Sequence, residues 1–252
     1  MSAPQLPAGW RLDARVTVGS TNEEAKRLAL EGAAEFTAVW ALEQTSGRGR
    51  RGRSWTSPRG NLYLSIVLKP EVPPSETAQI GFVAAVALAD ALRDVVPPST
   101  SIAMKWPNDV LVNRRKVSGI LPEIVSTGAT GQVKMLVLGM GVNVANHPQQ
   151  TTWPATDLNE AGARVELEDL LERVTAALDH WIGVWRTEGF APVRQRWKEE
   201  ALPVGEPVEL RLDGRTLAGR FLGIDVDGAL VLGSADGTRQ LIRAGEVFFP
   251  GV

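Results

Sequence analysis

The end of this chain differs in pattern from everything before it, and this difference constrains the fold more than any other feature. After residue 202 come four short β-like runs, at 208–212, 217–222, 229–232 and 240–242. Asp-Gly pairs at 213–214, 227–228 and 236–237 separate these runs, and this dipeptide favours the tight turn of a β-hairpin. We therefore predict a small β-barrel over residues 202–252.

The preceding residues, 1–201, combine strand patterns with helical ones. Ser20, followed three residues later by Glu23, is typical of a capping box and predicts a helix running to about residue 32. Further helices are predicted after residue 75, over 165–188 and ending near 200, and strands at 36–42, 62–68, 120–125 and 133–138. The expected fold class is α+β, with a mixed β-sheet flanked by helices in residues 1–201.

Composition excludes several classes of protein. The formal net charge of −2 lacks the broad basic excess of a protein that coats duplex nucleic acid. The chain has no cysteine, which fits a reducing cytosol, and its two histidines are too few for a three-histidine metal site. The N-terminus shows no signal-peptide pattern, and no apolar run approaches the roughly 20 residues that span a bilayer. We expect a cytoplasmic protein that binds neither membrane nor nucleic acid.

The most distinctive segment is residues 47–55, in which four arginines alternate with three glycines before a tryptophan. Glycine lets backbone N–H groups approach a ligand closely, and arginine donates two hydrogen bonds at once to phosphate or carboxylate. The segment is typical of an anion-binding loop, but also of a solvated charged loop or a flexible RGG-type nucleic-acid segment. Its position between two expected strands argues against disorder, and the net charge argues against nucleic acid.

Three further clusters carry polar residues at turns or strand ends. The run 105–109 predicts a turn whose Asp109 is available to hold Mg²⁺ beside phosphates, although such turns are common without any ligand. Lys116 lies near a turn, three residues before Gly119, and a lone lysine there is usually solvated. The run 139–143 places two glycines around a strand end, followed by Asn143, whose amide could contact a base edge.

Together these segments resemble the biotin protein ligases. The resemblance rests on the runs 20–22, 43–53, 105–109, 116–121 and 139–143, in this order and spacing, and it covers nearly the whole chain. It implies a catalytic domain of the class II synthetase/biotin ligase type, followed by an SH3-like barrel. It also implies that ATP, with Mg²⁺ as cofactor, activates biotin to biotinyl-5′-AMP and that pyrophosphate is released. Biotin then passes to a lysine of a biotin carboxyl carrier protein domain, and the enzyme is a monomer or a homodimer.

The resemblance also assigns roles to individual residues. The expected catalytic residues are Lys116, Arg50 and Asp109, with Asp109 also contacting the metal ion. Biotin is expected to contact Ser20, Thr21, Asn22, Gln44, Gly47, Arg48, Gly49, Arg50, Lys116 and Gly119. The nucleotide is expected to contact Arg51, Arg53, Trp55, Asn143 and Trp153. For Trp55 we favour the site over core packing, and for Trp153 both interpretations stay open.

Some biotin protein ligases carry an N-terminal winged-helix domain and repress transcription. Here the Ser-Thr-Asn motif begins at residue 20, so we expect a ligase without repressor function. Two alternatives stay open. Lipoate ligases run the same two-step chemistry but do not typically carry the arginine-glycine run. A non-catalytic sensor of biotin or nucleotide is disfavoured by the set Arg50, Asp109 and Lys116.

Overall fold

The larger part of the computed structural model, which describes residues 4–151, 153–212 and 214–249, is a seven-stranded sheet. Its strands are β1 (Arg11–Val18), β2 (Thr37–Gln44), β3 (Leu62–Leu68), β4 (Ile102–Lys105), β5 (Asp109–Val112), β6 (Arg115–Thr127) and β7 (Val133–Val142). Their order is β1-β2-β3-β7-β6-β5-β4, with β1 parallel to β2 and the other neighbours antiparallel, so the sheet is mixed as predicted.

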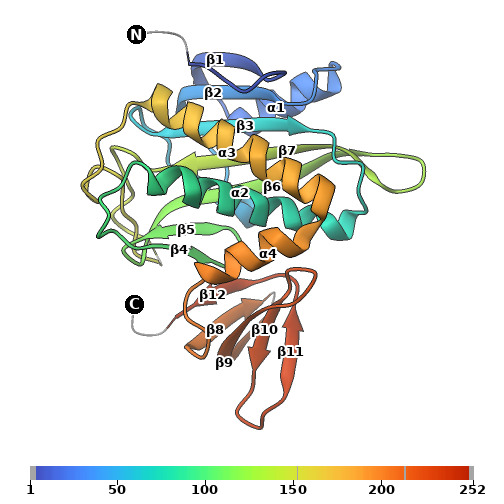
Figure 1. Cartoon of the computed structure of the whole chain (residues 1–252), viewed down its shortest axis with the longest axis vertical. Helices are drawn as coiled ribbons and strands as arrows, with labels where there is room; N and C mark the ends of the chain where they lie inside the picture. Colours follow the sequence, from blue (N-terminus) through green and yellow to red (C-terminus); the bar gives the residue numbers. More distant parts are fainter. Residues whose placement is uncertain (1–3, 152, 213, 250–252) are drawn as a thin grey trace.

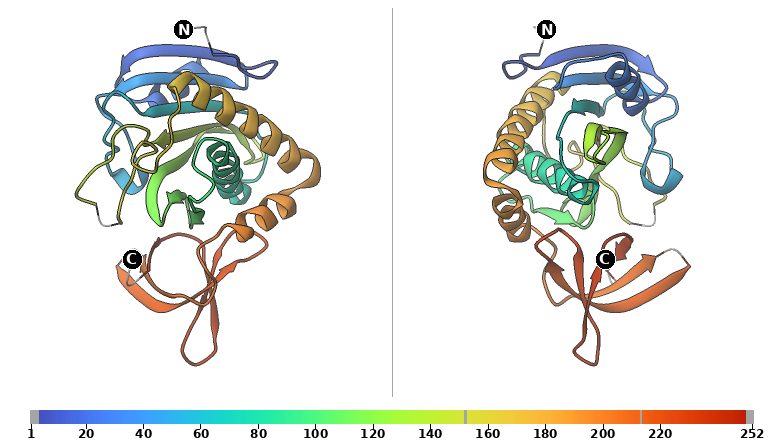
Figure 2. Two further views of the ribbon diagram at one scale, coloured as in Figure 1. Left: turned by 60° about the vertical axis from the view of Figure 1, so that its left-hand side comes forward. Right: turned by 90° about the vertical axis from the view of Figure 1, so that its right-hand side faces the viewer.

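Helices cover both faces of this sheet (Figures 1 and 2). They are α1 (Thr21–Leu30), α2 (Thr77–Arg93), α3 (Leu167–Glu188) and α4 (Phe190–Glu199), with single 3₁₀ turns η1 (Arg50–Gly52) and η2 (Pro74–Glu76). Side chains alternate along each strand, so Val39, Val67 and Val137 face α1 and form a small cluster with its alanines. Their strand neighbours, such as Leu64 and Leu138, belong to the main core under α2 and α3. The α1 face is therefore the thinly covered one.

Helix α2 is apolar on all sides because the sheet, α3 and α4 all pack against it. By length and composition alone, Pro74–Arg93 could cross a membrane, so the expectation that no apolar run approaches that length is wrong. Within the protein, 72% of this stretch is buried. Burial in the core accounts for the composition of the helix.

The start of α1 corrects a second expectation. Ser20 is the N-cap residue, as predicted, with extended backbone angles (φ −154°, ψ 134°), but its side chain makes no capping hydrogen bond to the described residues. The Glu23 carboxylate instead contacts Lys26 Nζ at 2.9 Å and Arg48 Nη1 at 2.8 Å. The capping box is wrong because stronger, charged partners occupy the carboxylate.

The C-terminal part is a five-stranded antiparallel sheet, shown below the larger part in Figure 1. Its strands are β8 (Pro207–Leu212), β9 (Arg215–Ile224), β10 (Leu230–Gly233), β11 (Arg239–Ile242) and β12 (Glu246–Phe248). The four predicted runs match β8 to β11, whereas β12 was missed; Asp213 of the first predicted turn lies outside the described residues. Trp106 Nε1 joins the two parts by donating to the Gly228 carbonyl oxygen at 3.0 Å. The division at residue 202 stays a prediction.

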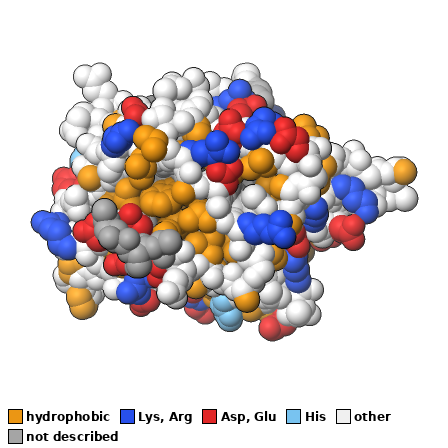
Figure 3. Space-filling model, turned by 90° about the horizontal axis from the view of Figure 1, so that it is seen from above, with side chains coloured by type: hydrophobic (Ala, Val, Ile, Leu, Met, Phe, Trp, Pro, Cys, Tyr) orange, Lys and Arg blue, Asp and Glu red, His pale blue; other side chains and the backbone are white. Residues whose placement is uncertain are grey.

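The opposite end of the molecule is formed by the edge strand β1. Seen from above, hydrophobic side chains gather there among charged groups of both signs (Figure 3). Val16 of β1 is 60% exposed, while Arg15 and Asp13 of the same strand form a salt bridge at 2.5 Å. Charged residues on an edge strand oppose pairing with another sheet.

Candidate active site

The floor of the site is a patch of the sheet without side chains. Gly139 and Gly141 of β7 lie on the α1 face, and Gly119 of β6 pairs with Gly141. A Cβ at Gly139 would lie 2.7 Å from Asn22 Cγ, and one at Gly141 would lie 2.5 Å from Trp55 Nε1. These glycines let Asn22 and Trp55 lie directly on the strands.

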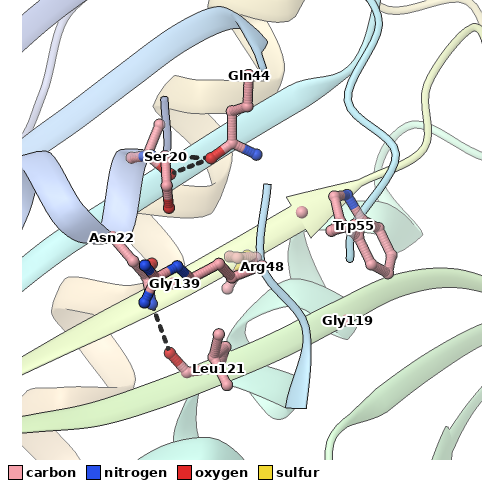
Figure 4. A pocket seen from close by; sticks show the side chains of 11 residues that line it. Ser20, Asn22, Gln44, Arg48, Trp55, Gly119, Leu121 and Gly139 are labelled. Atoms are coloured by element: carbon pink, nitrogen blue, oxygen red, sulfur yellow. Dashed lines mark hydrogen bonds between the residues drawn. The ribbon is translucent and has the colours of Figure 1, made fainter. Parts of the chain in front are cut away.

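A small cavity of about 30 Å³ opens between this floor and the first turn of α1 (Figure 4). Gln44, at the end of β2, holds that turn because its Oε1 accepts from the backbone nitrogen of Thr21 at 2.8 Å and from Thr21 Oγ1 at 3.1 Å. Gln44 Nε2 donates to Ser57 Oγ at 2.9 Å. The lining residues are Ser20, Thr21, Asn22, Gln44, Arg48, Trp55, Gly119, Leu121, Gly139, Met140 and Gly141.

The Asn22 amide has one fixed orientation in this cavity. Its Oδ1 accepts from Ser65 Oγ at 2.6 Å, and its Nδ2 donates to Glu123 Oε2 at 2.6 Å and to the Leu121 carbonyl oxygen at 3.3 Å. Burial raises the pKa of Glu123, but the bonds from Asn22 and Lys26 outweigh it, so the pKa lies below its ordinary value. Glu123 therefore stays ionised and holds the amide.

The arginine-glycine run forms a compact turn beside the small cavity. Gly49 N donates to the Arg53 carbonyl oxygen at 2.7 Å, and Arg48 pairs with Ser54 as an isolated bridge. Arg51 adopts φ 56° and ψ 38°, the left-handed region, which places a bend at the tip. The loop is held to α1 by the contact of Arg48 with Glu23.

A larger cavity of about 410 Å³ adjoins the small one and shares Arg48, Trp55, Gly119 and Leu121 with it. Its remaining lining residues are Gly49, Arg50, Arg53, Ser54, Thr56, Lys105, Pro107, Asn108, Asp109, Lys116, Ile120, Asn143, Pro148, Gln150, Thr151, Trp153, Ala155, Glu246 and Phe248. The cavities share residues of the floor and of the loop, so the two cavities adjoin one another.

Two lysines share one carboxylate in the larger cavity. Lys116 Nζ lies 2.6 Å from Asp109 Oδ1, and Lys105 Nζ lies 3.4 Å from Asp109 Oδ2. Burial raises the pKa of Asp109, but the two ammonium groups outweigh burial and lower it overall. Burial lowers the pKa of Lys105 despite the attraction of Asp109. The excess positive charge makes this corner a place for an anion.

Arginines of the loop complete the cavity. Arg50 Nη1 donates to Asn108 Oδ1 at 3.2 Å, and burial lowers the pKa of this guanidinium, which stays charged at physiological pH. Arg53 Nη2 contacts Glu246 Oε2 of β12 at 2.5 Å. Phe248 of the same strand also lines the cavity. The C-terminal sheet therefore forms part of the wall.

The segment after β7 forms the remaining wall. Trp153 is 7% exposed, its Nε1 donates to the Arg114 carbonyl oxygen at 3.2 Å, and Lys105 Nζ lies 4.9 Å from its ring centroid. Asn143 Nδ2 donates to the Thr156 carbonyl oxygen at 3.0 Å. Trp153 thus belongs both to the core and to the cavity wall. Core packing and contact with a ligand, the two roles left open by the sequence, are compatible for this residue.

The structure brings most of the predicted site residues together around the two cavities. Gly47 and Arg51, by contrast, line neither cavity in the described part of the chain. Sequence reasoning gave no role to several lining residues, namely Lys105, Asn108, Leu121, Gly139, Gly141, Glu246 and Phe248. Lys105, Gly139 and Gly141 could have been found from the sequence, because they lie in the runs 105–109 and 139–143. No feature of the sequence marks Glu246 or Phe248 as residues of the site.

Comparisons with known proteins bear on this site. Residues 15–143 match the model of the Biotin/lipoate A/B protein ligase family, and residues 204–249 match the Biotin protein ligase C terminal domain. The biotin–[acetyl-CoA-carboxylase] ligase of Paracoccus denitrificans is 43% identical, with 92% of this chain and 98% of the relative covered. The bifunctional ligase/repressor BirA of Escherichia coli is 34% identical, with 83% and 65% covered. The structure of the Aquifex aeolicus biotin protein ligase in complex with biotin and ATP is 28% identical, with a TM-score of 0.81 and 94% and 97% covered.

Proposed function

The chain belongs to the biotin/lipoate A/B protein ligase family and is a ligase of the biotin protein ligase type, and from this premise we propose its reaction. ATP activates biotin to biotinyl-5′-AMP with release of pyrophosphate. The biotinyl group then passes to the lysine of a biotin carboxyl carrier protein. The relative from Paracoccus denitrificans is named for acetyl-CoA carboxylase, which supports this class of acceptor.

The junction of the two cavities carries the proposal. A ring bound between Asn22 and Gln44 would extend its acid chain over Gly119 towards Lys116. A nucleotide in the larger cavity would then present its α-phosphate to that carboxylate. Holding both reactants in contact supplies much of the rate enhancement in such a reaction.

Activation joins two anions, so the site must offset negative charge. A carboxylate oxygen of biotin attacks the α-phosphorus, and the bond to the pyrophosphate oxygen breaks. We assign Arg50 and Lys116 to stabilise the charge on the phosphorus oxygens. In the second half-reaction, the acceptor lysine supplies the nucleophile and AMP leaves. The enzyme needs no cysteine or histidine for either step.

Asp109 is the residue that we propose to contact Mg²⁺. Its carboxylate lines the larger cavity, and Mg²⁺ favours one or two carboxylates together with phosphate oxygens. Both of its oxygens contact lysines in this structure, so a phosphate that attracts Lys116 would free one of them. Bound Mg²⁺ would neutralise phosphate charge.

For the nucleotide we propose contacts with Arg53, Trp55, Asn143 and Trp153 of the larger cavity, and with Arg51, which lies at the tip of the loop outside the cavity lining. For biotin we propose contacts with the small cavity and the adjoining loop. We also propose a cytoplasmic ligase without repressor function. A DNA-binding assay tests the absence of repressor function, since tight sequence-specific binding would contradict it.

The first test is pyrophosphate–ATP exchange with Mg²⁺ in the presence of biotin, lipoate or no acid. We expect exchange that depends on biotin alone. Exchange with lipoate alone would identify a lipoate ligase. Binding of biotin without any exchange would contradict the catalytic proposal and favour a sensor.

A further inference from the structure

His147 is a half-buried titratable group to which the proposed chemistry gives no role. It follows β7, at the start of the segment that forms one wall of the larger cavity. Its side chain is 12% exposed, and its Nδ1 lies 2.7 Å from Asp157 Oδ2. This contact joins two residues ten positions apart, and Pro148, Gln150 and Thr151 between them line the cavity.

Asp157 is a firm anchor for this contact. Its other oxygen, Oδ1, accepts from the Glu160 backbone nitrogen at 2.8 Å. The neighbouring Thr156 N donates to the Lys116 carbonyl oxygen at 2.9 Å, and Leu158 N donates to the Asn143 carbonyl oxygen at 3.1 Å. His147 is therefore tied to the same backbone that positions Lys116.

Both nitrogens of the imidazole have polar partners. Nδ1 contacts Asp157 Oδ2 at 2.7 Å, and Nε2 contacts Gln149 Nε2 at 3.0 Å. Glu160 Oε2 lies 3.6 Å from Nε2, and Arg115 Nη1 neutralises this carboxylate from 2.6 Å. His147, Asp157 and Glu160 could in principle hold a metal ion, but Arg115 already occupies one of the three groups. The arrangement suits a structural tie better.

We infer that His147 is a positioning residue for the nucleotide, because its bond to Asp157 holds Pro148, Gln150 and Thr151 against the larger cavity. The inference rests on the proposed function in one respect, namely that ATP occupies this cavity. Without the bond, the segment gains conformations that binding must remove, and ATP affinity falls. None of these segment residues lines the small cavity, so we expect the affinity for biotin to change much less than the affinity for ATP.

Three substitutions of His147 distinguish loss of the bond to Asp157 from loss of the imidazole ring. His147→Asn keeps an N–H donor at the position of Nδ1, His147→Gln places its amide near the position of Nε2, and His147→Ala removes both. The matched control is His180→Gln, since His180 is exposed on α3. Melting temperatures of all four variants establish whether each is folded. If His147→Ala is not folded, His147→Asn and His147→Gln carry the test.

The first readout is the KM for each substrate in pyrophosphate exchange. We expect His147→Gln and His147→Ala to raise the KM for ATP about tenfold, as for loss of one hydrogen bond to a charged group, with the KM for biotin within about twofold. His147→Asn and His180→Gln should resemble the unmodified protein. Equal increases in both KM values, or an unchanged KM for ATP in the Gln and Ala variants, would overturn the inference.

The second readout does not require catalysis. His180→Gln leaves His147 as the sole histidine, so its ring C–H proton signals are assigned directly by NMR. We expect ATP to shift these signals and biotin alone to leave them in place. A protein that binds ATP without such a shift refutes the positioning role, whereas ATP binding with the shift but without exchange refutes only the proposed function.

Discussion

Substitution of Gly139 by alanine gives the sharpest test of how the site is built. A Cβ at this position would lie 2.7 Å from Asn22 Cγ and 2.8 Å from Asn22 Nδ2. The amide cannot move aside without losing its bonds to Ser65 and Glu123. The bond to the Glu123 carboxylate contributes about 1.5–3 kcal/mol and the bond to Ser65 about 1 kcal/mol. We therefore expect Gly139→Ala to lower the free energy of unfolding by about 2.5–4 kcal/mol.

Urea unfolding measures this loss, and pyrophosphate exchange measures its effect on the small cavity. Because the amide leaves its place in the cavity wall, the KM for biotin should rise about tenfold or more, which corresponds to at least about 1.4 kcal/mol. The matched control is Gly183→Ala in α3, where a Cβ meets none of the described atoms within 4 Å. We expect this control to stabilise the protein by about 0.5–1 kcal/mol.

A second substitution, Asn22→Ala, distinguishes the clash with the Asn22 side chain from other effects of the new methyl group. In an Asn22→Ala background the methyl has room, so Gly139→Ala should cost no more than about 0.5 kcal/mol, which is the scatter expected of uncoupled sites. If the cost stays the same in both backgrounds, the clash with Asn22 is not its cause. An unchanged stability of the single variant would refute the reasoning outright.

Three further predictions concern the larger cavity and the C-terminal sheet. Lys116→Ala should fold normally and lose about 100- to 1000-fold in biotin-dependent exchange, as for one oxyanion-hole donor, and full activity would contradict its assignment. Because the pKa of Asp109 is lowered in the folded state, its contribution to stability is present above about pH 4 and is lost as pH falls through the folded value. The stability difference from Asp109→Asn in urea should therefore be large at pH 7 and shrink towards pH 3. Trp106→Phe removes the bond to Gly228 and should cost about 1 kcal/mol in the same assay.

The sequence was sufficient to predict those helices and strands whose apolar residues recur with a clear period. Helix α3 and strand β3 lie within two residues of their predicted bounds, and α2 begins within two residues of its predicted start, because a buried helix or strand leaves an unbroken apolar pattern. Strand β1 was missed because charged residues and exposed Val16 interrupt its pattern on the sheet edge. Strand β12 was missed because it has three residues, too few to show a period.

The site was predictable to the extent that its residues lie in the recognised motifs. The roles of Gly139 and Gly141 depend on the register with β3 and β6, which no single segment reveals. Glu246 of β12 contacts Arg53 of the arginine-glycine loop although the two are far apart in the sequence. Such contacts follow from the packing of the two parts and have no local signature.

The charge pairs of the site explain how a chain of net charge −2 can hold a cluster of arginines for anions. Arg48 contacts Glu23, Arg53 contacts Glu246 and Lys116 contacts Asp109, each within 3.0 Å. A bound anion would compete for these cations, and each cation that moves frees a carboxylate. Arg50 differs, because its hydrogen-bond partner is the neutral amide of Asn108. Arg50 forms no salt bridge with the residues that the structure describes, so it can meet a phosphate without losing one. Lys116 differs, because an anion that attracts it would release Asp109 as a possible metal ligand.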